Sequence, residues 1–271
     1  MTAGQRTRRA TRARTMFRGL GATLRNAFAE AGANRMALGS QMAVMALNDL
    51  VWVVFWILFF HQVGTVRGWD VELMLLLQAT LTTAGGVALG VFANARRLGA
   101  MAVDGDLDAV LALPVPPLAY LLLRRIEPVH LGDIVFGVVL FTVAGHPTVA
   151  RTAVFAGVVV AAVVLTTSFL VLTGSMAFFV GRSEASDLGF HGLLLLSSYP
   201  VDIFAGLAKL VLYTVIPAAF VATVPARLVD SFDAVDAAWL VATAIGFGVA
   251  GWATFTVGLR RYTSGAVWTR A

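Results

Sequence analysis

The chain has 271 residues, of which 59% are hydrophobic and only 13% are charged, whereas ordinary soluble domains have about 25% charged residues. That supply of polar side chains is too small to cover a water-soluble surface, so the composition excludes a soluble globular domain and predicts an all-α integral membrane protein. The net charge of +5 does not indicate a nucleic-acid partner, because the arginines flank apolar runs and form no basic domain. Cysteine is absent and the four histidines are far apart, so we expect no metal site.

The N-terminal region begins with a basic tail over residues 1–13, for which we expect disorder, and continues as an amphipathic helix over residues 14–33. This helix is too polar to span a bilayer. We interpret it as an interfacial helix with its apolar face in the membrane and its arginines near lipid headgroups, and packing on protein is the alternative. The apolar positions recur at helical spacing and are Met16, Phe17, Leu20, Leu24, Phe28 and Ala31.

Six apolar segments follow, and most of them have about the 20 residues that a membrane-spanning helix needs. The stretch 188–229 is too long for one span, and Pro200, Pro217 and Pro225 interrupt it. We interpret it as a fifth span followed by a re-entrant segment over 205–230, and two short spans are the alternative. The predicted spans cover residues 36–60, 71–95, 120–144, 153–180, 187–204 and 237–259.

The basic residues predict the orientation of these spans. With the N-terminus in the cytoplasm, sixteen of the twenty basic residues lie in cytoplasmic segments, and only Arg67, Arg151, Lys209 and Arg227 lie on the opposite side. This asymmetry agrees with the positive-inside rule. Because the number of spans is even, the C-terminus is also expected in the cytoplasm.

The polar connection between the second and third spans contains a short amphipathic helix, predicted over residues 104–113 with about two turns. Either of two aspartates can cap its N-terminus, and a group of prolines stops it. An apolar face rimmed by acids suits docking into a groove on another protein, and packing back on its own bundle is equally compatible. The residues of this candidate interface are Asp104, Gly105, Asp106, Leu107, Asp108, Val110, Leu111 and Pro114.

Polar residues within the apolar spans mark candidate pathway positions, because they are unfavourable in hydrocarbon. Asn48 and Asp49 lie near the middle of the first span, and Gln78 and Thr82 lie in the second. We expect Asp49 to face a cavity, a partner subunit or a basic group, with Gln78 and Thr82 as candidate hydrogen-bond donors. A purely structural interhelical bond is the alternative.

Enzymatic function has weaker support. The sequence has no Gly-x-x-x-x-Gly-Lys-Ser/Thr loop, no Gly-x-Ser-x-Gly turn and no His-Glu-x-x-His motif. Glu127, His130 and Asp133 have a spacing that places them on one helical face, where a charge network with Arg124 and Arg125 is favoured over catalysis. An intramembrane enzyme using these residues or Asp49, and a non-transporting membrane scaffold, stay open as alternatives.

Three motifs occur in a fixed order after the basic N-terminal helix. Gly105 to Pro114 follow the pattern Gly-x-Leu-Asp-x-x-Leu-x-x-Pro, residues 199–204 read YPVDIF, and residues 215–220 read VIPAAF before Pro225. Together with the six-span layout, this order resembles the permease subunits of ABC-2-type exporters, in the branch described as ABC-2 family transporter protein.

The resemblance implies that residues 14–33 form an elbow helix and that residues 104–113 form a coupling helix against a separate ATP-binding subunit. It implies two permease subunits in a bacterial inner membrane, surrounded by lipid, with ATP and Mg²⁺ bound by the partner and no cofactor bound by this chain. The region around 205–230 is expected to help close the pathway at the outer face. Its marked residues are Tyr199, Pro200, Asp202, Lys209, Pro217 and Pro225, among which Asp202 and Lys209 are expected to pair.

Overall fold

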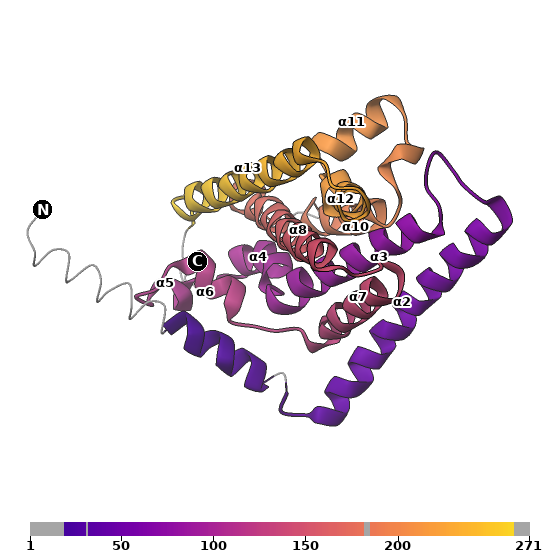
Figure 1. The fold of residues 1–271 in the computed structure, drawn as a ribbon. Coiled ribbons are helices and arrows are strands. Elements are labelled where there is room, and N and C mark those ends of the chain that lie inside the picture. Colours follow the sequence, from indigo (N-terminus) through magenta and orange to yellow (C-terminus); the bar gives the residue numbers. More distant parts are fainter. Residues whose placement is uncertain (1–18, 31, 182–184, 263–271) are drawn as a thin grey trace, which may run out of the picture.

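The computed structural model describes residues 19–30, 32–181 and 185–262, and every regular element within these ranges is helical. The all-α class is therefore confirmed (Figure 1). Four helices are long and apolar enough to cross a membrane, and the number rises to six if each of two bent helix pairs forms one span. The four helices cover Arg35–Val63, Val71–Asp104, Val149–Val180 and Ala234–Leu259.

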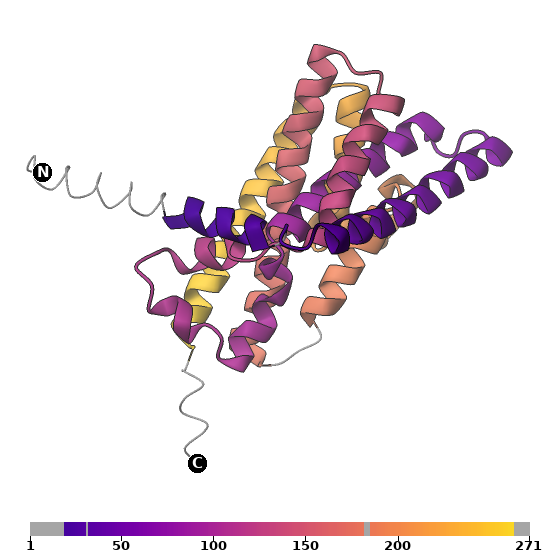
Figure 2. The same ribbon diagram turned by 90° about the horizontal axis from the view of Figure 1, so that it is seen from below.

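The N-terminal helix is described over residues 19–30, and the predicted positions 14–18 and 31 lie outside the described residues. It lies across the bundle, at a large angle to α8 and α13 (Figure 2). Helix α2 (Arg35–Val63) follows, and the Asn34 side chain caps it by accepting a hydrogen bond from the Ala37 amide. It ends at Gly64, whose φ of +77° favours glycine.

The second predicted span is longer than expected. Helix α3 (Val71–Gly86) continues through a π-helical turn, η1 (Val87–Val91), into α4 (Asn94–Asp104). Arg96 and Arg97 lie within α4, and the Arg96 guanidinium stacks 4.5 Å from the centre of the Phe190 ring. The helical segment therefore continues beyond residue 95, where the sequence predicted the end of the span.

The third predicted span, 120–144, is broken. The one-turn helix α5 (Asp108–Leu111) is followed by α6 (Pro117–Leu123), the 3₁₀ turn η2 (Pro128–His130) and α7 (Leu131–Ala144). The chain bends by 70° between α6 and α7. The bend occurs because Pro128 disfavours a helical conformation at Glu127, whose backbone is extended and donates to the Gly90 carbonyl at 2.9 Å.

Two further long helices pack against each other, α8 in the interior of the bundle and α13 on its outside. Helix α8 (Val149–Ser175) begins at a Thr148 cap and leads into α9 (Ala177–Val180). Helix α13 (Ala234–Leu259) begins at an Asp233 cap. Each begins three or four residues before its predicted span because these caps satisfy the first amides. At about 1.5 Å per residue, α13 is about 39 Å long, so residues before and after it lie at opposite ends of the bundle.

The region between α9 and α13 differs from its prediction. Helix α10 (Ala185–Ser197) has only 13 residues and ends before residue 204, where the sequence predicted the end of the fifth span. The 3₁₀ turn η3 (Val201–Ile203) follows it. Helix α11 (Gly206–Thr214) and the pair η4 (Ala219–Thr223) and α12 (Val224–Asp230) are bent by 68°, as in a broken span or re-entrant loop.

Small residues allow the central helices to approach closely. A Cβ at Gly86 of α3 would lie 2.8 Å from the Ile134 amide nitrogen of α7, and one at Gly137 of α7 would overlap the Thr83 hydroxyl of α3. Because these positions have no side chain, the backbones of α3 and α7 can pack directly against each other. Gly85 faces open space, so only some of the glycines in this helix serve the contact.

Candidate functional site

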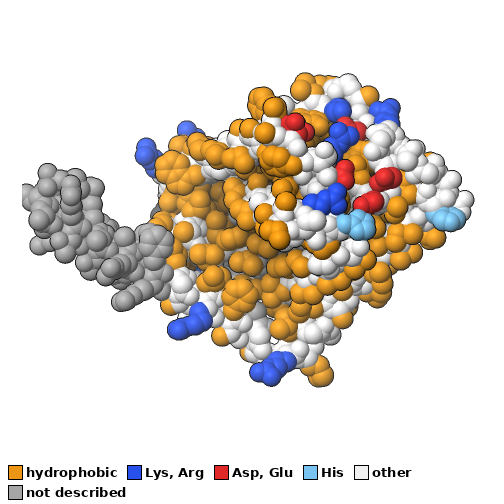
Figure 3. All heavy atoms as spheres, in the orientation of Figure 1, with side chains coloured by type: hydrophobic (Ala, Val, Ile, Leu, Met, Phe, Trp, Pro, Cys, Tyr) orange, Lys and Arg blue, Asp and Glu red, His pale blue; other side chains and the backbone are white. Residues whose placement is uncertain are grey.

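Large apolar side chains cover much of the molecular surface, and charged side chains gather at one end of the face shown in Figure 3. Helices α2 and α13 are the least covered long helices, with only 22% of the most apolar window of each buried. A soluble chain of this size would not expose so much apolar surface, so these faces contact lipid or another protein.

The 104–113 segment differs in local structure from the two-turn helix that the sequence predicted. Asp104 is the last residue of α4, and Gly105 ends that helix with a φ of +84°. Helix α5 covers only Asp108–Leu111, and its N-cap is Leu107 rather than Asp104 or Asp106. The predicted capping role of the two aspartates was therefore wrong.

The predicted apolar face of the 104–113 segment is divided. Leu107 and Val110 are each only 1% exposed and belong to one buried apolar cluster with residues of α4, α6, α8 and α13, including Phe255. Leu111 and Leu113, in contrast, are each 40% exposed. The buried pair fixes the segment to the bundle, and the exposed pair is the part that can contact another protein.

The end of α13 also contacts this segment. Burial, followed by the neighbouring Asp108 carboxylate, raises the pKa of Tyr262 to about 12. The hydroxyl therefore lies beside Asp108, the first residue of α5. Through this contact and Phe255, α13 holds the 104–113 segment in place.

The intramembrane carboxylates lie at the junction of α2, η2 and α7. The Asp49 carboxylate interacts electrostatically with Asp133 and His130, and the His130 Nδ1 lies 3.0 Å from the Asp133 Oδ2. One oxygen of Asp49 and one of Asp133 are buried without a hydrogen-bond partner among the described residues. Asn48, by contrast, has an exposed side chain.

The predicted partners of Asp49 make other contacts. Gln78 donates to the Ser198 carbonyl at 3.4 Å, and Thr82 donates to the Gln78 carbonyl within its own helix at 2.8 Å. The expectation that Gln78 and Thr82 bind Asp49 was therefore wrong. Gln78 instead joins α3 to the end of α10.

Glu127, His130 and Asp133 do not share one helical face, because the bend before α7 lies between Glu127 and the other two residues. Glu127 pairs with Arg125 at 2.8 Å, whereas His130 pairs with Asp133. The three residues are therefore not presented together as a catalytic group. Within the described ranges, no group of three His, Cys, Asp or Glu residues is placed to hold a metal ion.

A cluster of charges surrounds Asp202 between α10 and α11, and we call it the Asp202 cluster. The Asp202 carboxylate accepts from Lys209 Nζ at 3.0 Å and from Trp69 Nε1 at 3.1 Å, and Arg227 Nη2 lies 2.8 Å away. Arg67 donates to the Asp202 carbonyl oxygen at 3.0 Å. The predicted Asp202–Lys209 pair is confirmed.

The electrostatic balance of the Asp202 cluster favours the charged carboxylate. Partial burial alone would raise the pKa of Asp202, but the hydrogen bonds from Lys209 and Trp69 and the charge of Arg227 outweigh it. The pKa of Asp202 is therefore lower than its ordinary value of 3.8.

The Asp202 cluster contains residues that sequence reasoning did not select. A two-residue turn at Arg67 and Gly68 joins Val66 and Trp69 in an antiparallel bridge, and both turn residues have positive φ. This turn carries Arg67 and Trp69 to Asp202, more than 130 residues away in sequence. In the sequence, the only local indication of a role for Arg67 and Trp69 was their position in a polar segment between two predicted spans.

The other marked residues of this end pack nearby. Tyr199 makes edge contacts with Trp52 and Trp56 of α2, with ring centres 6.3 and 5.8 Å apart. Pro200 precedes η3, Pro217 precedes η4, and Pro225 is buried in the first turn of α12. The prolines therefore lie at or beside the breaks between the short helices.

Comparison with known protein families assigns the chain to a family. The model of a family described as ABC-2 family transporter protein matches residues 46–266. The chain belongs to this family. No curated protein and no solved structure matches it. As a member of the ABC-2 family, the chain is a multi-pass membrane permease of ABC-type transport, in a family that is generally non-catalytic. The family works in general with an ABC ATP-binding partner.

Proposed function

We propose that this ABC-2 permease is the transmembrane subunit of an ATP-driven exporter, with both termini in the cytoplasm of a bacterial cell. The family match over residues 46–266 carries this proposal. A separate subunit binds ATP and Mg²⁺, and this chain forms the pathway without a cofactor of its own. In this orientation, the 104–113 segment faces the cytoplasm and the Asp202 cluster faces outward.

The 104–113 segment is proposed as the contact with the ATP-binding subunit. Its exposed leucines, Leu111 and Leu113, lie beside residues that are fixed in the core by Leu107 and Val110. A segment held in this way transmits force, because displacement of its exposed side moves the helices that hold its buried side. The buried contacts with α8 and α13 supply a route from ATP hydrolysis to the spans.

The test is copurification of a tagged permease with its ATP-binding subunit. The double change Leu111→Asp and Leu113→Asp should reduce the recovered ATP-binding subunit by at least about tenfold, because two charges replace the apolar contact. Phe232→Asp is the matched control, since Phe232 is 63% exposed in the turn before α13, at the opposite end. Normal recovery with the double variant would refute the assignment.

A second permease subunit is proposed to cover α2. The exposed side of α2 carries Asn48 in the middle of the span, and an amide facing hydrocarbon is unfavourable. The exposed face of α13 carries Val241, Ile245, Val249 and Trp252, which suit lipid tails. Asn48 hydrogen-bonds the Asp49 carboxylate, and a copy of this chain or a related permease over α2 would shield both polar groups from the hydrocarbon.

Cysteine cross-linking tests the α2 contact directly, because the chain contains no cysteine of its own. Val51→Cys on α2 should form a disulfide-linked dimer in membranes, and Val249→Cys on α13 should not. Both positions are exposed valines, 62% and 60% respectively, so the comparison isolates the helix. The opposite result would assign the contact to α13.

A further inference from the structure

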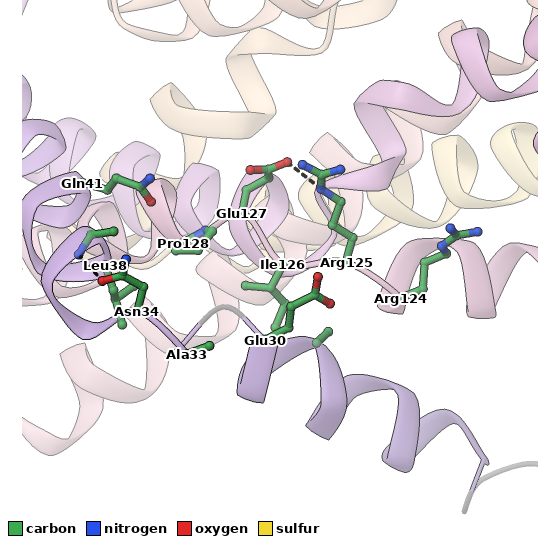
Figure 4. Close-up of a pocket in the computed structure, with 12 residues that line it drawn as sticks. Glu30, Ala33, Asn34, Leu38, Gln41, Arg124, Arg125, Ile126, Glu127 and Pro128 are labelled. Atoms are coloured by element: carbon green, nitrogen blue, oxygen red, sulfur yellow. Dashed lines mark hydrogen bonds and ion pairs between the residues drawn. The ribbon is translucent and has the colours of Figure 1, made fainter.

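A cavity of about 500 Å³ lies where the N-terminal helix meets the start of α2 and the bend before α7 (Figure 4). Its volume falls in the range of about 300–1,000 Å³ that small-molecule sites occupy. Asn34 and Ala37, at the first turn of a candidate membrane span, line one side of it. The cavity is therefore at the depth of lipid headgroups, whichever side of the membrane it faces.

The charges of this cavity are mixed rather than basic. Two arginines, Arg124 and Arg125, and two glutamates, Glu30 and Glu127, line it. Arg125 and Glu127 neutralise each other at 2.8 Å. Glu30 and Arg124 form no ion pair with any other described residue, and both are exposed. The Glu30 carboxylate and the Arg124 guanidinium are therefore available to bind a ligand that carries both charges.

The two free charges come from different elements. In Figure 4 the Glu30 carboxylate points from the N-terminal helix toward the 124–127 segment, and Arg124 belongs to that segment. Both residues also line a second cavity of about 340 Å³, which extends to Val110 and Leu113. A ligand between Glu30 and Arg124 would therefore lie next to the 104–113 segment.

We infer that this cavity binds the headgroup of a phosphoethanolamine lipid. The phosphate pairs with the Arg124 guanidinium, which offers two parallel N–H donors to an anion. The primary ammonium donates to the Glu30 carboxylate. A purely anionic headgroup leaves Glu30 opposed to negative charge, and a choline headgroup has no N–H to donate.

This inference goes beyond transport and does not require it. Binding is measured on the purified full-length chain, without the ATP-binding subunit or a cargo. The chain is equilibrated with vesicles that contain phosphatidylethanolamine, its mono- and dimethylated forms, phosphatidylcholine or phosphatidylglycerol, and retained lipid is counted by native mass spectrometry.

Phosphatidylethanolamine should be retained about tenfold more than phosphatidylcholine, with a decline at each methylation, because each methyl group removes a donor. Glu30→Gln should lower retention of phosphatidylethanolamine to that of phosphatidylcholine. Arg124→Gln should lower retention of both lipids. Equal retention of the two lipids by the unaltered chain would overturn the inference without any variant.

Two controls separate this site from general charge effects. Arg25→Gln changes an exposed arginine of the same N-terminal helix that lines neither cavity, and Glu72→Gln changes a glutamate paired with His146. Both variants should retain phosphatidylethanolamine as the unaltered chain does, and loss in either would contradict a specific site. Displacement of the lipid by equimolar soluble phosphoethanolamine or inorganic phosphate would overturn a membrane lipid as the occupant.

Discussion

The two ends of the bundle are held by different forces. At one end, Leu107 and Val110 bury apolar side chains against α4, α8 and α13. At the other, the Asp202 carboxylate accepts a hydrogen bond from Trp69 in the turn before α3 and pairs with Lys209 of α11 and Arg227 of α12. Apolar packing has no directional requirement, whereas the Asp202 cluster depends on distances of 2.8 to 3.1 Å.

This difference corresponds to the roles proposed for the ends. A buried, closely packed apolar contact moves together with the helices that hold it, so it suits a segment that an ATP-binding subunit displaces. Ion pairs with defined geometry suit a closed end that opens as a unit. Variants that each remove one kind of contact test whether apolar packing at one end contributes more to the free energy of unfolding than the ion pairs at the other.

Leu107→Asp should have the largest effect on stability. A carboxylate replaces a side chain that is 1% exposed, so both the lost packing and the buried charge lower the free energy of unfolding, by at least about 3 kcal/mol. Thermal unfolding in detergent, followed by the fluorescence of the six tryptophans, measures the change. Leu111→Asp is the control, because that leucine is 40% exposed and its change should stay below about 1 kcal/mol. Similar losses in both variants would mean that the two leucines are equally buried.

The sequence could predict spans but not where tertiary contacts alter them. The long apolar runs led directly to α2, α8 and α13, because hydrocarbon imposes one simple requirement on a helix. Within α4, Arg96 contacts the ring of Phe190, which is 94 residues later in the chain. No local pattern contains that contact. The break before α7, in contrast, had a visible signal in Pro128.

The candidate sites show the same division between local and distant information. The Asp202–Lys209 pair was predictable because the two residues are seven positions apart. Trp69 and Arg67 were not, because the turn that carries them reaches Asp202 from a distant part of the sequence. For residues 104–113, the sequence predicted that Leu107, Val110 and Leu111 share one apolar face, but Leu107 and Val110 are buried whereas Leu111 is exposed. Periodicity cannot assign these directions in a helix of one turn.

Asp202→Asn should have the next largest effect. The amide keeps the shape of the side chain but loses the charge that faces Lys209 and Arg227, so the free energy of unfolding should fall by about 1–2 kcal/mol. The loss in unfolding free energy is no larger because solvent screens Lys209 and Arg227, whose side chains are 42% and 46% exposed. Thermal unfolding measures it. Asp230→Asn, which removes the more exposed pair with Arg151, should cost less. Equal losses would show that the geometry around Asp202 adds nothing.

The pH dependence of stability should identify the same carboxylate. Because the folded pKa of Asp202 is lower than 3.8, its contribution is fully present above that pH and is lost as the pH falls through the folded pKa. The difference in melting temperature between the unaltered chain and Asp202→Asn should be constant from pH 7 to about pH 5 and should shrink in stronger acid. A difference that shrinks between pH 7 and pH 5 would contradict the lowered pKa.

Glu72→Gln should have the smallest effect. The Glu72 carboxylate lies 3.4 Å from His146, but the two side chains are 49% and 73% exposed, so solvent already satisfies both groups. The expected loss in unfolding free energy is below about 0.5 kcal/mol, which exposed ion pairs rarely exceed. Glu72→Gln and Asp202→Asn remove the same charge from the same end of the bundle, so their comparison holds net charge constant. If melting temperatures fall equally in the two variants, that end is stabilised by its overall charge; a larger fall for Asp202→Asn assigns the stability to the contacts that converge on one carboxylate.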